Sequence, residues 1–274
     1  MKYIEEIIEP KNSVGGEGVQ LCGYIPDNFD QINISRKHPA VLILPGGGYG
    51  RVSQREKEPV ALKFLAEGIC AFTLEYSVGP QKVFPRALCE VALAMDYIRT
   101  HAKEYNIDEE NISICGFSAG GHLAATFGAF WNKDFVKDII GPDKDPRPNK
   151  VILSYPVITS GEYAHQGSFE NVLGDKKDDP KMRELLSMEN QVTSEFPPVF
   201  IWHTFEDNAV PVMNTLLFAK ALAENDILTE MHIYPKGRHG LSLGSHLVEG
   251  DKDYSYRHES SEWIDKAIGF IYRY

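Results

Sequence analysis

The chain alternates between short apolar runs and longer segments in which apolar and polar residues follow a helical period. Apolar residues dominate 40–44, 69–74, 112–115, 151–155 and 199–203, and a further strand-like run occupies 229–234. Solid apolar runs of this length are typical of strands that are covered on both faces, because such strands have no side that faces water. They predict a sheet whose central strands are buried.

The segments between these runs favour helices. Apolar residues recur every three or four positions in 58–67, 85–103, 212–223 and 261–272, so each of these segments is expected to bury one face. Pro85 is suited to begin a helix and Gly68 to end one. The alternation predicts the α/β class, with a mostly parallel central sheet and helices on both faces. Ligands of such sheets bind beyond the carboxyl ends of the strands, where we expect the functional motifs.

Two parts of the chain depart from this alternation. The first forty residues predict short antiparallel strands, one of them at 19–24. Residues 159–196 are polar, rich in Gly, Asp and Lys, and without a clear period. We interpret them as an excursion over the functional site, so residues 1–274 are expected to form one domain.

Composition and charge exclude several classes of protein. The 274 residues carry a net charge of −11, which argues against binding to nucleic acid or to an anionic membrane. The sequence shows no basic segment followed by an apolar core and no apolar run of membrane-spanning length, which predicts a cytoplasmic protein. The four cysteines lack metal-ligand spacing and are expected to be buried free thiols: Cys22, Cys70, Cys89 and Cys115. No metal or other cofactor is expected, and a homo-oligomer is compatible with the sequence.

The most informative local pattern is an apolar strand that leads directly into Gly116-Phe117-Ser118-Ala119-Gly120 and then into a helix-forming run at 123–130. A turn that joins a strand directly to a helix strains its corner residue and leaves little space for neighbouring side chains. Gly116 and Gly120 meet this demand, so the Ser118 hydroxyl is expected to stand where a base can reach it. The Gly-x-Ser-x-Gly string is weak evidence alone, but between a strand and a helix it predicts a nucleophile elbow.

A serine hydroxyl is a poor nucleophile at neutral pH, so it needs a neighbouring base and a carboxylate that orients that base. Asp207 follows the 199–203 strand, in the loop before a helix, and is the expected carboxylate. Glu206 is the competing acid, and a helix N-cap is the alternative role for Asp207.

The expected base is His239, which follows the last strand and has glycines on both sides that leave it free to reach Ser118. The rival histidines are His122, His203, His232 and His246. His203 and His232 lie inside predicted strands, and His122 begins the helix after the elbow, which makes these three less suitable. The resulting chain order of Ser, Asp and His is that of α/β hydrolases.

The loop Pro45-Gly46-Gly47-Gly48-Tyr49 follows the 40–44 strand. Its glycines allow backbone amides to approach a substrate closely, where they can stabilise the negative oxygen that forms during acyl transfer. A phosphate-binding turn is the alternative, but no Lys-Ser or Lys-Thr pair follows and Gly-x-Gly-x-x-Gly is absent. The amide of Ala119, next to the nucleophile, is the second expected donor.

Together these motifs resemble the α/β-hydrolase superfamily over nearly the whole chain. Within it, the chain is most similar to small serine esterases related to hormone-sensitive lipase and to the acetyl and feruloyl esterases that deacylate plant polysaccharides. The resemblance is carried by the glycine loop, the elbow, Arg55-Glu56-Lys57-Glu58-Pro59, Asp207-Asn208-Ala209-Val210-Pro211 and Gly237-Arg238-His239-Gly240.

One departure narrows the resemblance. The hormone-sensitive-lipase group has a His before the three glycines, whereas this chain has Pro45, which favours the carbohydrate-esterase branch. The resemblance also implies that Gly47 and Gly48 supply oxyanion amides together with Ala119.

These inferences predict a serine hydrolase that cleaves short-chain carboxylic esters through an acyl-enzyme, with a small-molecule ester as its partner. Ser118 would be the nucleophile, His239 the base, and Asp207 the group that fixes the imidazole tautomer. An acylated sugar is favoured because the polar side chains of 159–196 can hydrogen-bond hydroxyls but cannot shelter a long acyl chain; these are Glu162, His165, Asn171, Asp175, Lys176, Lys177, Asp178 and Asp179. The alternative for 159–196 is a solvated loop without substrate contact. The alternative functions of the protein are a small peptidase of the same fold and a catalytically silent binding protein.

Overall fold

The apolar run at 40–44 lies at the centre of a sheet. It belongs to β3 (His38–Leu44), every residue of which is buried in the computed structural model. Ala40, Leu42 and Leu44 pack into a hydrophobic cluster on one side of the sheet, and Val41 and Ile43 pack into a second cluster on the other side. Because side chains alternate along a strand, an all-apolar run is the pattern of a strand held between two layers.

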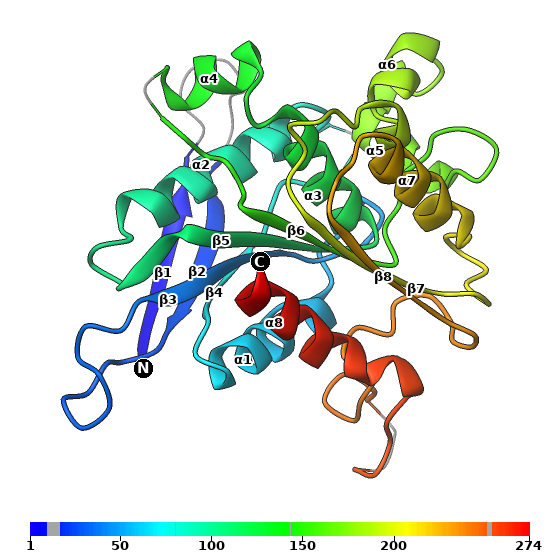
Figure 1. Ribbon diagram of the computed structural model, residues 1–274. Helices are drawn as coiled ribbons and strands as arrows, with labels where there is room; N and C mark the ends of the chain where they lie inside the picture. The colour runs from blue at the N-terminus through cyan, green and yellow to red at the C-terminus, as the bar shows by residue number, and fades with distance from the viewer. Residues whose placement is uncertain (10–16, 80, 143, 251–253) are drawn as a thin grey trace.

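The structure describes residues 1–9, 17–79, 81–142, 144–250 and 254–274. They contain an eight-stranded sheet with the order β1-β2-β4-β3-β5-β6-β7-β8 (Figure 1). Its other strands are β1 (Lys2–Ile8), β2 (Val19–Ile25), β4 (Cys70–Leu74), β5 (Ile107–Phe117), β6 (Lys150–Ser154), β7 (Val199–Thr204) and β8 (Thr229–Tyr234). β2 runs antiparallel to β1 and β4, whereas all pairs from β4 to β8 are parallel, which confirms the predicted mostly parallel sheet.

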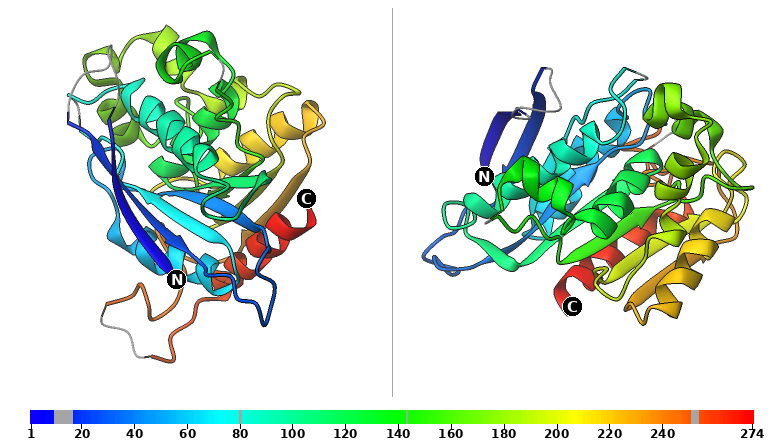
Figure 2. Two further views of the ribbon diagram at one scale, coloured as in Figure 1. Left: turned by 90° about the vertical axis from the view of Figure 1, so that its left-hand side faces the viewer. Right: turned by 90° about the horizontal axis from the view of Figure 1, so that it is seen from above.

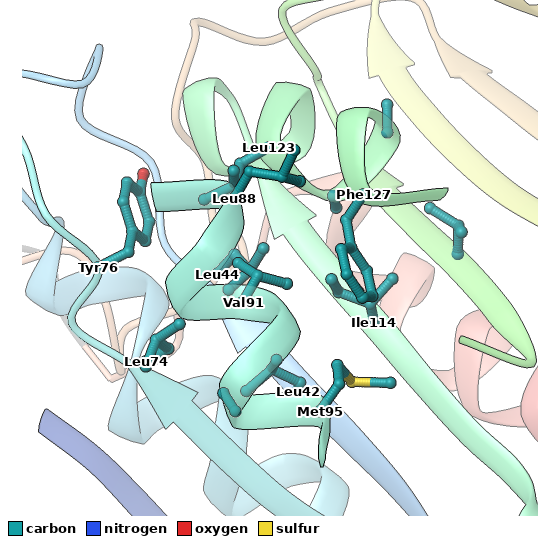
Figure 3. Packing of buried hydrophobic residues seen from close by; sticks show 14 of the residues in the cluster. Leu42, Leu44, Leu74, Tyr76, Leu88, Val91, Met95, Ile114, Leu123 and Phe127 are labelled. Carbon is teal, nitrogen blue, oxygen red and sulfur yellow. The ribbon is translucent and has the colours of Figure 1, made fainter. Parts of the chain in front are cut away.

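Helices cover both faces of the sheet (Figure 1). On one face lie α1 (Glu58–Ala66) and α8 (Trp263–Arg273), and on the other lie α2 (Arg86–Thr100), α3 (Ala119–Phe130) and α7 (Met213–Glu224). Figure 3 shows Leu88, Val91 and Met95, spaced at helical intervals on α2, packed over Leu42 and Leu44 of β3. Full burial of each such side chain contributes about 1.5–3 kcal/mol to stability, so this layer holds α2 firmly against the sheet.

The predicted elements differ from the observed ones mainly at their ends. The helix expected at 85–103 is α2, and the strand expected at 112–115 extends back to Ile107 in β5. The first half of β5 carries Asp108, Glu109 and Glu110, whose polarity obscures the strand pattern. The short α4 (Asp134–Ile140) was not predicted. The expected antiparallel strands near the N-terminus are present as β1 and β2.

The predicted excursion at 159–196 contains regular structure that its sequence pattern did not indicate. The segment contains α5 (Gln166–Leu173) and α6 (Pro180–Leu185), together with short 3₁₀ turns. Phe169, Val172 and Leu173 are buried at helical spacing and join the main hydrophobic cluster. The polar residues around them hid this short apolar face, because two helical turns give too few positions for a clear period.

The sheet brings the ends of distant segments together. β1 and β8 form its two edges, and Figure 2 shows the N-terminal hairpin of β1 and β2 on the side away from β7 and β8. The carboxyl ends of β3, β5, β7 and β8 lead into the loops that carry the predicted functional motifs. All four cysteines are buried and free, as expected. Among the described helices, none combines the length and the hydropathy of a membrane span.

Candidate active site

Ser118 occupies the corner between β5 and α3. Its backbone angles are φ 53° and ψ −118°, a conformation that non-glycine residues rarely adopt. A Cβ at Gly116 would overlap the Gly120 carbonyl group, and a Cβ at Gly120 would overlap the carbonyl oxygens of Leu44 and Pro45. Glycine at both positions therefore lets the strand, the helix and the β3 loop meet closely enough to place Ser118 at the start of α3.

Three side chains from separate loops form a continuous chain of hydrogen bonds. Ser118 Oγ lies 2.8 Å from His239 Nε2, and His239 Nδ1 lies 2.6 Å from Asp207 Oδ2. An ionised carboxylate only accepts hydrogen bonds, so Nδ1 carries the proton and Nε2 is the acceptor for the Ser118 hydroxyl. The three residues selected from the sequence thus lie together with the geometry of a Ser-His-Asp triad.

The Asp207 carboxylate is fully buried but well supplied with donors. Its Oδ1 accepts hydrogen bonds from the amides of Ala209 and Val210 at 3.0 and 2.9 Å, and Oδ2 lies 3.3 Å from His203 Nε2. Burial alone would raise the pKa of Asp207, but hydrogen bonds from His203, His239 and the Val210 amide outweigh burial and hold that pKa well below its ordinary value. Asp207 is therefore ionised at neutral pH, as an acceptor for the imidazole must be.

The competing acid and the rival histidines have other surroundings. Glu206 is exposed, and α7 has Val212 rather than Asp207 at its N-cap position. The ring nitrogens of the buried His122 contact the Tyr49 hydroxyl and the Leu186 carbonyl. Those of the buried His203 contact the Thr215 hydroxyl, the Val210 carbonyl and Asp207, and not Ser118. His232 contacts Glu230, and His246 lies against the ring of Tyr254. Among these candidates, the structure places only His239 against Ser118.

The glycine loop after β3 offers backbone amides beside Ser118. The Gly46 amide already donates to the Glu56 carboxylate at 2.7 Å. The amides of Gly47, Gly48 and Ala119, by contrast, donate to no other group within the described chain. Gly47 and Gly48 have φ values of 129° and 63° and line the same cleft as Ser118. The geometry thus leaves the amides of Gly47 and Gly48, rather than that of Gly46, free to bind a ligand.

A buried polar network supports both loops. Its Glu56 lies in one of the motifs that carry the resemblance, but the sequence pattern assigned this residue no role. Glu56 accepts the Gly46 amide through one oxygen and the Tyr155 hydroxyl through the other, at 2.7 Å each. The Tyr155 hydroxyl in turn accepts the Ser242 amide at 2.8 Å, and the Tyr155 ring lies 5.1 Å from the His239 ring. Burial and the adjacent Glu56 raise the pKa of Tyr155 far above its ordinary value, so its hydroxyl keeps its proton. The network therefore connects the glycine loop to the His239 loop.

Ser118 opens into a polar cleft of about 330 Å³. The cleft is lined by Gly47, Gly48, Arg51, Ser53, Arg55, Glu56, Ser118, His165, Arg238, His239 and Gly240, a set without large apolar side chains. Of the polar residues noted in 159–196, only His165 belongs to this lining, and burial lowers its pKa. Asn171 instead supports the glycine loop by donating to the Gly48 carbonyl at 2.9 Å. The described residues include no group of His, Cys, Asp or Glu side chains that could hold a metal ion.

The comparisons with known proteins match most of the chain. The sequence profile of the BD-FAE family matches residues 27–222. Endo-1,4-beta-xylanase B of Butyrivibrio fibrisolvens is 39% identical over 81% of this chain and 36% of its own length. Acetylxylan esterase of Xylanibacter ruminicola is 32% identical over 84% of this chain and 45% of its own length. The chain thus spans less than half of each of these two relatives.

One solved structure matches over nearly the whole length of both chains. The acetyl ester-xyloside bifunctional hydrolase from Caldicellulosiruptor lactoaceticus is 36% identical, with a TM-score of 0.81 over 97% of this chain and 95% of that chain. The resemblance to esterases of the α/β-hydrolase superfamily, and the fold that it implied, are confirmed by these matches.

Proposed function

This chain belongs to the BD-FAE family, and from that membership and the geometry around Ser118 we propose that it is a serine esterase that removes short acyl groups, acetyl above all, from sugar hydroxyls. The observation that carries the proposal is the hydrogen-bonded chain of Ser118, His239 and Asp207 in a polar cleft that also presents the amides of Gly47 and Gly48. The names of the relatives, an acetylxylan esterase and an acetyl ester-xyloside hydrolase, support the substrate class.

The first half of the reaction acylates the serine. His239 Nε2 accepts the Ser118 hydroxyl proton while Oγ attacks the ester carbonyl carbon, and the carbonyl oxygen becomes an oxyanion. The amides of Gly47, Gly48 and Ala119 would stabilise that oxyanion. The carbon–oxygen bond to the sugar then breaks, and His239 returns the proton to the leaving sugar oxygen.

The second half releases the acid. Water adds to the acyl carbonyl as His239 accepts one of its protons, and the bond to Ser118 Oγ breaks as that proton passes to the serine. Asp207 stays ionised throughout, because its donors hold its pKa low, and it keeps the imidazole in the reactive tautomer. The products are a carboxylic acid and free serine.

The lining of the cleft supports a short acyl group. An apolar trough would reward each additional buried methylene with about 0.8 kcal/mol. The residues around Ser118 are glycines, polar side chains and arginines, so a long chain would find little apolar surface there. His165 and the arginines can instead hydrogen-bond hydroxyl groups.

A series of p-nitrophenyl esters from acetate to palmitate, followed by acetylated xylo-oligosaccharides, tests this function. We expect kcat/KM to be highest for the shortest acyl groups and acetate to be released from the acetylated sugars. A kcat/KM that rises beyond about eight carbons would contradict the short-acyl proposal, since it would require apolar burial worth several methylenes. Hydrolysis of the matched p-nitroanilide in preference to the ester would favour a peptidase, and absence of any turnover would favour a binding protein.

A further inference from the structure

The charged side chains that face the cleft are mostly cations. Arg51, Arg55 and Arg238 line it, although the protein as a whole carries a net charge of −11. The carboxylate in the lining, Glu56, is only 4% exposed, and both of its oxygens already accept hydrogen bonds. A ligand in the cleft therefore meets guanidinium groups rather than carboxylates.

Arg55 and Arg238 are held in place by one shared acid. Glu249 Oε1 lies 2.8 Å from Arg55 Nη2 and 2.7 Å from Arg238 Nη2. The carbonyls of Val248 and His239 accept a further hydrogen bond from Arg55 and Arg238, at 2.7 and 2.9 Å respectively. One carboxylate thus orders two guanidinium groups, and the assembly keeps one positive charge beside the His239 loop.

Arg51, unlike Arg55 and Arg238, is not held by an acidic side chain among the described residues. It lies on the turn of the glycine loop, where its backbone amide donates to the Gly47 carbonyl at 3.2 Å. Its side chain is exposed, and its guanidinium has no hydrogen-bond or ion-pair partner in the part of the chain that the structure describes. A guanidinium presents a planar fork of donors that matches anionic oxygens, so this one is free to bind an anion in the cleft.

We propose that these arginines, Arg51 above all, bind an anionic group on the alcohol part of the ester. The preferred substrate class is then an acylated acidic sugar, whose anion is a uronate carboxylate or a sugar phosphate. This inference rests on the proposed esterase function and adds the identity of the leaving alcohol. With acetyl as the acyl group, which carries no charge, the anion belongs to the alcohol part.

The net charge of the protein constrains how this recognition works. A net charge of −11 opposes the approach of anionic substrates at long range, so we attribute the preference to the arginines that line the cleft. The arginines attract an anion in the cleft over short distances. Salt screens the attraction between exposed charges, with a Debye length of about 8–10 Å. Added salt should therefore reduce the preference for an anionic sugar while leaving hydrolysis of a neutral sugar ester nearly constant.

The test compares acetate release from three matched esters: an O-acetylated methyl glucoside, the corresponding methyl glucuronoside, and the corresponding glucoside 6-phosphate. The readout is the ratio of kcat/KM for each anionic ester to that for the neutral ester, measured in one enzyme preparation. We expect a ratio on the order of tenfold in the wild type for at least one anionic ester, since a charge-assisted hydrogen bond is worth about that much. The ester with the higher ratio identifies the source of the anion.

Two variants make the test specific. Arg51→Ala should bring the ratio close to one. Arg36→Ala removes an exposed arginine beside the start of β3 and should leave the ratio unchanged. A ratio near one in the wild type, or an unchanged ratio in Arg51→Ala, would overturn the inference while leaving the esterase function intact. If none of the three sugar esters nor p-nitrophenyl acetate is hydrolysed, both the function and the inference are wrong.

Discussion

Replacement of Tyr155 by Phe removes a single oxygen from the buried network beneath the site. That oxygen donates to Glu56 at 2.7 Å and accepts from the Ser242 amide at 2.8 Å, so its loss leaves one buried acceptor and one buried donor without their partner. Each unsatisfied buried group costs about 1–3 kcal/mol, which predicts a loss of about 2–6 kcal/mol in the free energy of unfolding. This is a large share of the ~5–15 kcal/mol that stabilises a typical protein.

The same substitution should also lower activity. The phenyl ring keeps its contacts with His239 and Trp202, at centroid distances of 5.1 and 5.0 Å, so the packing is retained. The hydrogen-bonded connection between the glycine loop and the His239 loop is lost, however. Catalysis requires the oxyanion amides of the first loop and the imidazole of the second to keep their positions relative to Ser118. We expect kcat for p-nitrophenyl acetate to fall by about tenfold or more, because small misplacements of reacting groups cost factors of this size.

The assay is denaturant unfolding together with steady-state kinetics, with Tyr97→Phe as the matched control. The Tyr97 hydroxyl lies 2.9 Å from the Tyr105 hydroxyl on a half-buried surface remote from the cleft. Its loss should cost about 1 kcal/mol or less and leave kcat unchanged. Equal effects of the two substitutions on stability and kcat would refute the reasoning, as would a Tyr155→Phe variant with wild-type stability and turnover.

Other perturbations test further parts of the account. Asp207→Asn should lower turnover of p-nitrophenyl acetate by roughly four orders of magnitude, by favouring the wrong His239 tautomer, while Glu206→Gln on the exposed neighbour should have little effect; reversed effects would exclude Asp207. Burial lowers the pKa of His122 to about 4 from 6.5, so the unfolded chain binds a proton that the folded chain does not between these values. The free energy of unfolding should therefore fall as pH drops from about 6.5 to 4. In urea titrations the fall should be less steep for His122→Gln than for the wild type, and identical slopes would contradict this. Gly120→Ala should destabilise the fold by about 1–3 kcal/mol or more, because its Cβ would overlap two carbonyl oxygens; an unchanged thermal midpoint would contradict the close approach.

Much of the site could be predicted because the sheet converts sequence order into spatial order. Apolar runs mark the strands, and in a parallel sheet the residues that follow each strand meet at one edge. This placed Ser118, Asp207 and His239 on loops at that edge, and the structure brings them within hydrogen-bonding distance. The same reasoning placed the glycine loop of β3 beside the elbow.

The parts that could not be predicted depend on side chains that meet through tertiary packing. Nothing in the sequence distinguishes the buried Glu56 from the exposed Glu58 two positions later. Its burial follows from the Gly46 amide and the Tyr155 hydroxyl, which reach it from two other loops. Likewise, Arg51 and Arg238 are separated by most of the chain and line one cleft only when the loops after β3 and β8 meet at the same edge. Helix α5 was hidden because its buried face is only two turns long.

In the proposed mechanism the acyl group passes through Ser118 Oγ. Incubation with p-nitrophenyl acetate, followed by acid quenching, proteolysis and mass spectrometry, tests it directly. We expect an acetyl group on the peptide that contains Ser118. When deacylation is the slower step, we also expect a burst of nitrophenolate equal to the enzyme concentration. Ser118→Ala, with an unchanged thermal midpoint, should show neither. Acetylation at another residue together with wild-type turnover in Ser118→Ala would show that Ser118 is not the nucleophile.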